Sequence, residues 1–313
     1  MVKSKRKVRK GNLVYFILSL IIIVLLSYIS YNNFSKLDKY KISKEEKNKY
    51  NSLNKEYKEL EKSNKKIKDE LNELKDLNKK IATVKDDVFS LASKVEKKIQ
   101  NNESKAKIAY LTFDDGPYYM TDSVLKVLRE KQVKATFFTI GIGKEKCFDK
   151  KSVSCMDTYK RIVDNGHTIA NHTYSHSIFN GLYASVNNFM DQVVKQENLI
   201  KEKTGYTTNI IRFPGGSVTA GRLKDGIVDA LREKGYGWVD WTAEDGDGRD
   251  LESKEQAWRL LKNDLNDNIE VILMHDYNDI TYSILPDVID YLENEGYILL
   301  PLFYDSVMVN KEV

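Results

Sequence analysis

Residues 107–117 have the sequence KIAYLTFDDGP, an apolar run that ends in two aspartates and a Gly-Pro turn. The run predicts a buried strand, because it is short, apolar and bounded by a turn signal. Neighbouring residues on a strand point to opposite faces, so Asp114 and Asp115 can share one site only where the strand breaks into the turn. On its own, Asp-Asp-Gly-Pro is typical of an ordinary turn. Other segments must decide whether these residues form only a turn or a functional site.

The C-terminal two thirds of the chain repeats this pattern of apolar runs separated by amphipathic stretches. The runs lie at residues 107–113, 135–140, 168–170, 210–213, 237–241, 271–274 and 297–302, and the amphipathic stretches at residues 122–131, 186–204, 225–234, 255–266 and 284–295. Strands that alternate with helices predict a parallel sheet covered by helices. The expected fold at residues 106–313 is an α/β domain, a distorted (β/α) barrel of about seven parallel strands with function at their C-terminal ends.

The N-terminal part of the chain differs from this domain in charge. Residues 1–105 hold 26 Lys and Arg against 14 Asp and Glu, whereas the rest holds 24 against 32. The acidic C-terminal part therefore lacks the basic face that a nucleic-acid partner needs.

Residues 1–12 form a basic tail, and residues 13–31 form an apolar run long enough to cross a bilayer. Positive charge before the run predicts an N-terminus in the cytoplasm and a single-pass anchor in the cell membrane, with the catalytic part outside. A cleaved signal peptide is the alternative, but it has a shorter apolar run and a small-x-small cleavage site.

Residues 32–105 are expected to form a helical stalk. Apolar residues recur there with a spacing of seven, at Leu53, Leu60, Ile67, Leu74, Ile81, Val88 and Val95. The positions between them are mixed: Tyr57, Asn64, Leu71, Asn78, Lys85, Ala92 and Ile99. This heptad pattern predicts a coiled coil, most simply a parallel homodimer, and a disordered charged linker is the alternative.

A histidine pair follows the predicted strand at residues 168–170. His172 and His176 are two of only four histidines, and their spacing places both rings on one side of a helical turn or tight loop. Two histidines and one carboxylate can hold a divalent metal and leave positions free for water and substrate, which is typical of a catalytic site. The second aspartate of the Asp114-Asp115 pair is then free to act as a base. The pattern therefore favours a metal-dependent hydrolase.

Three further segments complete a pattern of five ordered motifs: Arg212-Phe213-Pro214-Gly215-Gly216, Asp240-Trp241 and Leu273-Met274-His275-Asp276. With them, residues 106–302 resemble a polysaccharide deacetylase of carbohydrate esterase family four, the nodulation-deacetylase homology domain. The resemblance implies a distorted barrel that removes acetyl groups from N-acetylated sugars. It also implies a divalent metal, zinc first, with cobalt, manganese or nickel as alternatives.

The same resemblance implies roles for single residues. The metal would be bound by Asp115, His172 and His176, and Asp114 would act as the general base. Arg212 would tether Asp114 and lower the pKa of its carboxyl group. His275 would be the general acid, oriented by Asp240.

The remaining roles concern the acetyl group. The backbone N–H of Gly215 would stabilise the oxyanion, and Trp241, Leu273 and Pro214 would line the acetyl pocket. The family commonly has an aromatic residue after the proline, where this chain has Gly215-Gly216. The backbone donor survives this change, but an aromatic wall of the sugar groove is missing.

The expected substrate is a cell-envelope glycan, most simply N-acetylglucosamine of peptidoglycan. Alternatives are deacetylation of muramic-acid residues, of chitin-like oligomers or of an exopolysaccharide, hydrolysis of another amide or ester, and a catalytically inactive envelope scaffold. The only cysteines, Cys147 and Cys155, are expected to form a disulfide outside the cell, with no role in the chemistry.

Overall fold

The computed structural model describes residues 22–32, 44–78, 85–142 and 155–310. The chain divides into two compact units, residues 1–66 and residues 67–313. In the first unit, residues 22–32 are helical, and helix α2 (Lys44–Asn78) begins. No helix within the described ranges is long and apolar enough to cross a membrane. The basic tail and residues 13–21 of the expected anchor lie outside the described residues.

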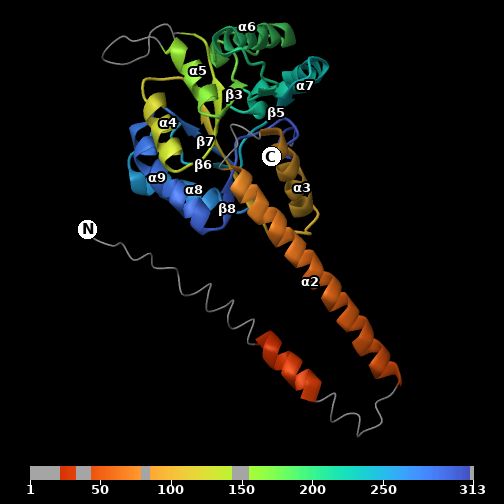
Figure 1. The fold of residues 1–313 in the computed structure, drawn as a ribbon. Coiled ribbons are helices and arrows are strands. Elements are labelled where there is room, and N and C mark those ends of the chain that lie inside the picture. The colour runs from red at the N-terminus through yellow and green to blue at the C-terminus, as the bar shows by residue number, and fades with distance from the viewer. Residues whose placement is uncertain (1–21, 33–43, 79–84, 143–154, 311–313) are drawn as a thin grey trace, which may run out of the picture. The chain divides into compact units, whose positions relative to one another are not determined.

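The second unit is an α/β domain whose helices surround its strands (Figure 1). Its strands are β1 (Lys107–Asp114), β2 (Thr136–Thr139), β3 (Thr168–Asn171), β4 (Ile210–Ile211), β5 (Gly237–Trp238), β6 (Ala243–Glu244), β7 (Ile269–His275) and β8 (Tyr297–Leu299). Its helices are α3 (Lys85–Gln100), α4 (Thr121–Glu130), α5 (Met156–Asp164), α6 (Val186–Thr204), α7 (Lys224–Glu233), α8 (Lys254–Asp264) and α9 (Asp279–Asn294). Two 3₁₀ helices, η1 (Ile178–Asn180) and η2 (Ser217–Leu223), follow strands β3 and β4.

The strands form one sheet in the order β5-β4-β3-β2-β1-β7-β6, and β8 pairs with β1 beside this path. Every pair in the sheet is parallel. Within the described residues the end strands β5 and β6 do not pair with each other, so the sheet is curled and open on that side. This architecture agrees with the predicted distorted (β/α) barrel. Because all strands run the same way, their C-terminal ends lie along one edge of the sheet.

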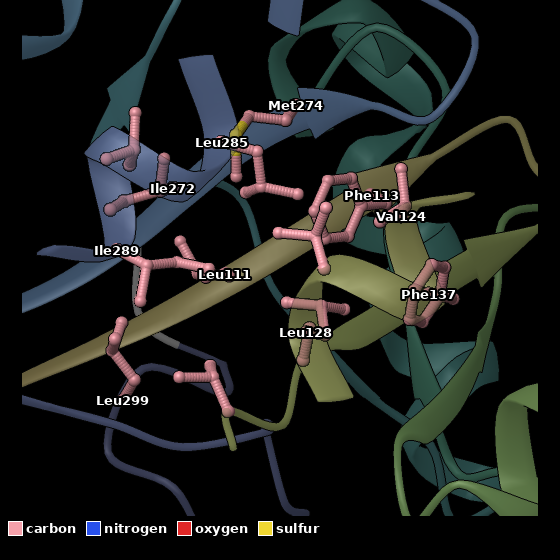
Figure 2. Packing of buried hydrophobic residues seen from close by; sticks show 14 of the residues in the cluster. Leu111, Phe113, Val124, Leu128, Phe137, Ile272, Met274, Leu285, Ile289 and Leu299 are labelled. Carbon is pink, nitrogen blue, oxygen red and sulfur yellow. The ribbon is translucent and has the colours of Figure 1, made fainter. Parts of the chain in front are cut away.

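Strand β1 pairs with β2, β7 and β8 and is buried on both faces. Its outward face carries Leu111 and Phe113, which pack against Val124 and Leu128 of α4 (Figure 2). The next strand, β7, continues this layer beneath α9, with Ile272 and Met274 near Leu285 and Ile289 (Figure 2). A central strand buried on both faces is expected to be a continuous apolar run, as the sequence of β1 is.

The inward face of β1 carries Ile108 and Tyr110, which belong to a second core that fills the curled sheet. Helix α3 contributes Ala92, Val95 and Ile99 to this core, and all three are buried. The compact unit therefore begins before residue 106, and these three heptad positions belong to the core of the domain.

A buried polar contact reinforces the packing of α3. The Glu96 side chain accepts hydrogen bonds from Tyr110 Oη at 2.5 Å and Ser306 Oγ at 2.7 Å. The coiled coil therefore remains a prediction for α2, where Leu53, Tyr57 and Leu60 are exposed.

Candidate active site

The parallel sheet brings the sequence motifs together at one edge. Asp114 ends β1 and His275 ends β7, and the register of these two strands places the two residues side by side. His172 directly follows β3, and Arg212 directly follows β4. Residues separated by more than 150 positions in the sequence therefore meet because each ends a strand of the same parallel sheet.

The first cluster at this edge consists of Asp115 and the two histidines. One ligand atom from each of Asp115, His172 and His176 lies within 4.8 Å of the others, close enough to bind one metal ion. Asp115 Oδ1 is 3.6 Å from His172 Nε2 and 3.4 Å from His176 Nε2. This carboxylate oxygen is buried and has no hydrogen-bond partner within the described residues. A buried carboxylate oxygen without a partner, facing two imidazole nitrogens, fits a cation-binding site.

The local backbone explains how these three side chains converge. Residues 172–176 form a loop rather than a helical turn, and Thr173 and His176 have positive φ angles of 64° and 51°. Asp115 also has a positive φ angle, 67°, which turns its side chain toward the same side as that of Asp114. Such backbone conformations are uncommon for residues other than glycine and concentrate at functional sites.

His172 is held in the state that a metal ligand requires. Its Nδ1–H donates a hydrogen bond to the Arg212 carbonyl oxygen at 2.8 Å, so the Nε2 lone pair faces Asp115. Burial, together with the neighbouring His176, lowers the pKa of His172 to about 3, which keeps the ring neutral. A neutral imidazole whose second nitrogen is fixed by a carbonyl is the usual arrangement of a metal-binding histidine.

Asp114 lies beside this cluster and is fixed by Arg212. The Arg212 guanidinium is fully buried, and Nη1 donates to Asp114 Oδ1 at 2.9 Å and to Thr112 Oγ1 at 2.7 Å. The other carboxylate oxygen, Asp114 Oδ2, is 3.6 Å from His172 Nε2 and faces the cluster. Burial raises the pKa of Asp114, and the nearby Arg212 charge offsets only part of this effect. Arg212 tethers Asp114 and lowers its pKa as expected, but burial is the larger influence, so the net shift of the pKa is upward.

His275 has a different carboxylate partner from the one that the sequence predicted. Its Nδ1 and its backbone N–H each lie 2.6 Å from a carboxylate oxygen of Asp247. The predicted partner, Asp240, instead accepts hydrogen bonds from the backbone N–H and the hydroxyl group of Ser217, at 2.9 and 2.5 Å. Asp240 thus orients the loop after β4, and Asp247 orients His275.

Asp247 raises the pKa of this histidine. Burial lowers the pKa of His275, but the hydrogen bond and charge of Asp247, with help from Asp115 and Asp114, raise it to about 9. Nδ1 is held by Asp247, whereas Nε2 points into the site, 3.9 Å from Asp115 Oδ2. The ring is therefore protonated at neutral pH and presents one N–H to the site.

Asp247 is held in turn by residues that sequence reasoning missed. Its backbone N–H donates to Asp245 Oδ1 at 3.1 Å, and Thr281 Oγ1 lies 2.6 and 2.8 Å from carboxylate oxygens of Asp245 and Asp247. Burial, together with the charge of Asp247, raises the pKa of Asp245 to about 7. The only signal in the sequence was the segment Asp245-Gly246-Asp247-Gly248, which has no apolar run before it long enough to predict a strand.

The residues expected to surround the acetyl group lie at the same edge of the sheet. Gly215 is exposed in a turn that the Thr219 hydroxyl fixes by donating to the Gly215 carbonyl oxygen at 2.6 Å. Gly216 packs on the Trp241 ring, since a Cβ atom there would lie 3.1 Å from it. Leu273 lies two residues before His275 and therefore on the same face of β7. Pro214 is buried, and its carbonyl oxygen accepts a hydrogen bond from Tyr183 Oη at 2.8 Å.

One of the two cysteines of the predicted disulfide lies within the described residues. Cys155 precedes α5 and is disulfide-bonded. Cys147 lies outside the described residues, so the pairing of these two cysteines stays a prediction.

Comparison with known proteins agrees with this geometry. Residues 101–237 match the family described as Polysaccharide deacetylase. A peptidoglycan-N-acetylglucosamine deacetylase from Bacillus cereus is 30% identical over 231 residues, which cover 70% of this chain and 80% of that protein. The chain belongs to the polysaccharide deacetylase family. The members of this family that it resembles are hydrolases.

A second relative and a solved structure agree with this assignment. A second peptidoglycan-N-acetylglucosamine deacetylase from Bacillus cereus is 31% identical over 188 residues, covering 60% of this chain and 62% of that protein. The crystal structure of the catalytic domain of a peptidoglycan N-acetylglucosamine deacetylase from Eubacterium rectale superposes with a TM-score of 0.59 at 31% identity. That match covers 66% of this chain and 93% of the crystallised domain.

Proposed function

We propose that this deacetylase is metal-dependent and hydrolyses the N-acetyl groups of N-acetylglucosamine in a cell-envelope glycan, with peptidoglycan as the substrate. The observation that carries the proposal is Asp115 Oδ1, which faces two imidazole nitrogens and has no hydrogen-bond partner among the described residues. Asp114 and His275 lie close to the same cluster. The peptidoglycan deacetylases among its relatives support the choice of glycan.

Asp115, His172 and His176 would hold the cation. A divalent cation bound there would polarise the acetyl carbonyl and lower the pKa of the attacking water. Zinc suits two imidazoles and one carboxylate, and we propose it as the resident metal.

Asp114 and His275 would move the protons. Asp114 Oδ2 takes a proton from the attacking water, while Arg212 keeps Oδ1 in place. Burial raises the pKa of Asp114 toward the pH at which the enzyme works, and a general base is more effective when its pKa is close to that pH. His275 Nε2–H donates its proton to the departing sugar nitrogen, and Asp247 fixes the ring for this step. The Gly215 N–H, in its exposed turn, is available to the developing oxyanion. The products are acetate and a sugar with a free amine.

The N-terminal part fits an enzyme that works on a polymer next to the membrane. We propose that residues 13–31 anchor the chain, with the basic residues before them in the cytoplasm and the deacetylase outside. We also propose that α2 pairs with a second copy, because its heptad residues Leu53, Tyr57 and Leu60 are between 49% and 57% exposed.

Acetate release tests the catalytic proposal. The full chain, purified in mild detergent, is incubated with N-acetylated peptidoglycan and with chitotetraose, after zinc loading or after chelation. We expect acetate from peptidoglycan, its loss on chelation and its return with zinc. A zinc-loaded protein that releases no acetate from either glycan would instead favour an inactive envelope scaffold.

A further inference from the structure

The two most exposed large apolar side chains among the described residues of the folded unit lie at the rim of the active site. Phe179 is 97% exposed and Val218 is 78% exposed. Phe179 is the central residue of η1, three positions after the metal-ligand candidate His176, and Val218 lies in η2, three positions after Gly215. Apolar side chains exposed to this degree beside a catalytic centre mark a contact surface for a ligand.

Helix η1 lies against the turn that precedes η2, so the surface is continuous with the site. A Cβ atom on Gly215 would lie 3.2 Å from Ile178 Cδ1, which brings the loop after β3 against the loop after β4. The Tyr183 hydroxyl closes the same junction by donating to the Pro214 carbonyl oxygen at 2.8 Å. A ligand that spans this junction would reach both Phe179 and the oxyanion donor Gly215.

A polar hollow of about 330 Å³ lies directly beside Phe179. Its lining contains hydroxyl, amide and carboxylate groups, from Ser175, Ser177, Asn180, Asn188, Asp191 and Gln192. Ser177 lies two residues before Phe179, and Asn180 lies directly after it. Gln192 Oε1 accepts a hydrogen bond from the Ser175 N–H, next to His176, at 3.1 Å. The hollow is therefore lined by residues of the metal-ligand loop and by sequence neighbours of Phe179.

The chemistry of this surface matches a sugar. A pyranose ring has apolar C–H faces that pack on an aromatic ring, and hydroxyl groups at its edge that bond to amides and carboxylates. Ligand sites commonly combine an apolar wall with a few polar groups in this way. The lining includes Asp191 and no lysine or arginine, which disfavours a phosphate or an anionic lipid surface.

We propose that Phe179 and this hollow form a glycan subsite, which binds the sugar next to the one whose acetyl group is removed. The proposal rests on the proposed function for the polymer that passes through the site. It makes Phe179 a specificity residue that selects chains over single sugars, without a part in the chemical step.

Binding and kinetics with one probe, chitotetraose, test the subsite. Its affinity is measured by titration calorimetry, and acetate release from it is compared with acetate release from monomeric N-acetylglucosamine. For Phe179→Ala we expect the Kd and KM for chitotetraose to rise about three- to tenfold, with kcat and the monomer reaction unchanged. Phe179→Tyr, which keeps the ring, should behave as the wild type does.

A matched control removes an exposed aromatic ring elsewhere. Tyr206 is 56% exposed and precedes β4, at the opposite end of the strands, so Tyr206→Ala should leave both constants unchanged. Unchanged affinity in Phe179→Ala, or no measurable binding of chitotetraose to the wild type, would overturn the proposal. Loss of binding to phosphatidylglycerol vesicles in Phe179→Ala, with unchanged sugar affinity, would assign the surface to lipid and also overturn it.

The two proposals fail in different ways. Binding that depends on Phe179, without acetate release, retains the subsite and refutes the hydrolytic function. Acetate release whose KM is the same in wild type and Phe179→Ala retains the function and refutes the subsite.

Discussion

Replacing Asp247 by asparagine should move the alkaline limit of activity. In the wild type, His275 is the general acid and must be protonated, and its pKa is raised to about 9 from an ordinary value of 6.5. Activity is therefore present below pH 9 and lost as the pH rises through this value. Asp247 supplies the two largest of the influences that raise this pKa, its hydrogen bond and its charge. Asp247→Asn removes the charge, and burial then lowers the pKa of His275.

The size of the effect follows from the two protonation states. With the pKa at about 6.5 in the variant, His275 would be roughly 3% protonated at pH 8, against about 90% in the wild type. The smaller protonated fraction of His275 alone should therefore lower the rate at pH 8 about 30-fold. At pH 6 the ring is mostly protonated in both proteins, so this difference in rate nearly disappears. A less well oriented ring adds a loss that does not depend on pH, so the position of the alkaline limb is the quantity to measure.

The assay is the pH dependence of kcat/KM for acetate release from chitotetraose. Asp240→Asn is the matched control, because Asp240 contacts Ser217 and not His275. We expect the alkaline limb to move down by about two pH units or more in Asp247→Asn and to stay in place in Asp240→Asn. The opposite pattern, with Asp240→Asn moving the limb, would refute the assignment of Asp247 as the partner of His275.

Three further experiments test the site and the fold. Asp114→Asn should lower kcat about 10²–10⁴-fold with bound zinc retained, whereas His176→Ala should lose both, by acetate assay and metal analysis; equal metal loss would contradict the division into base and ligand. Arg212→Ala leaves the Asp114 carboxylate buried and should cost about 3–5 kcal/mol in urea unfolding, whereas the exposed Arg232→Ala should change little. Glu96→Ala should cost about 1–3 kcal/mol and exposed Lys97→Ala almost nothing, and equal melting temperatures would place α3 outside the core.

Much of the fold follows from local sequence patterns. Strands β1, β2, β3 and β7 lie within two residues of their predicted ends, because each is an apolar run bounded by turn residues. Strand β6 was missed, since its two residues, Ala243–Glu244, offer no apolar run. Helix α9 begins five residues before the predicted start at 284, because Asn278 caps it and Pro286 is accommodated inside. Such capping and accommodation depend on contacts that periodicity does not encode.

The site shows the same division. The residues that end strands, such as Asp114 and His275, were predicted because chemical motifs and strand ends coincide in the sequence. The partner of His275 was not, since Asp240 and Asp247 are equally plausible by residue type and only the path of the chain through β6 separates them. The lowering effect of Arg212 on the pKa of Asp114 was predicted, but the net upward shift was not, because the sequence reveals the nearby arginine and not the depth of burial.

The most direct test of the central claim is the structure of the product. Peptidoglycan is treated with the zinc-loaded full chain and digested with a muramidase, and the fragments are identified by mass spectrometry. We expect fragments in which N-acetylglucosamine has become glucosamine and muramic acid keeps its acetyl group. After chelation of the metal, both sugars should keep their acetyl groups. Acetyl groups lost from muramic acid, or intact fragments despite bound zinc, would contradict the central claim.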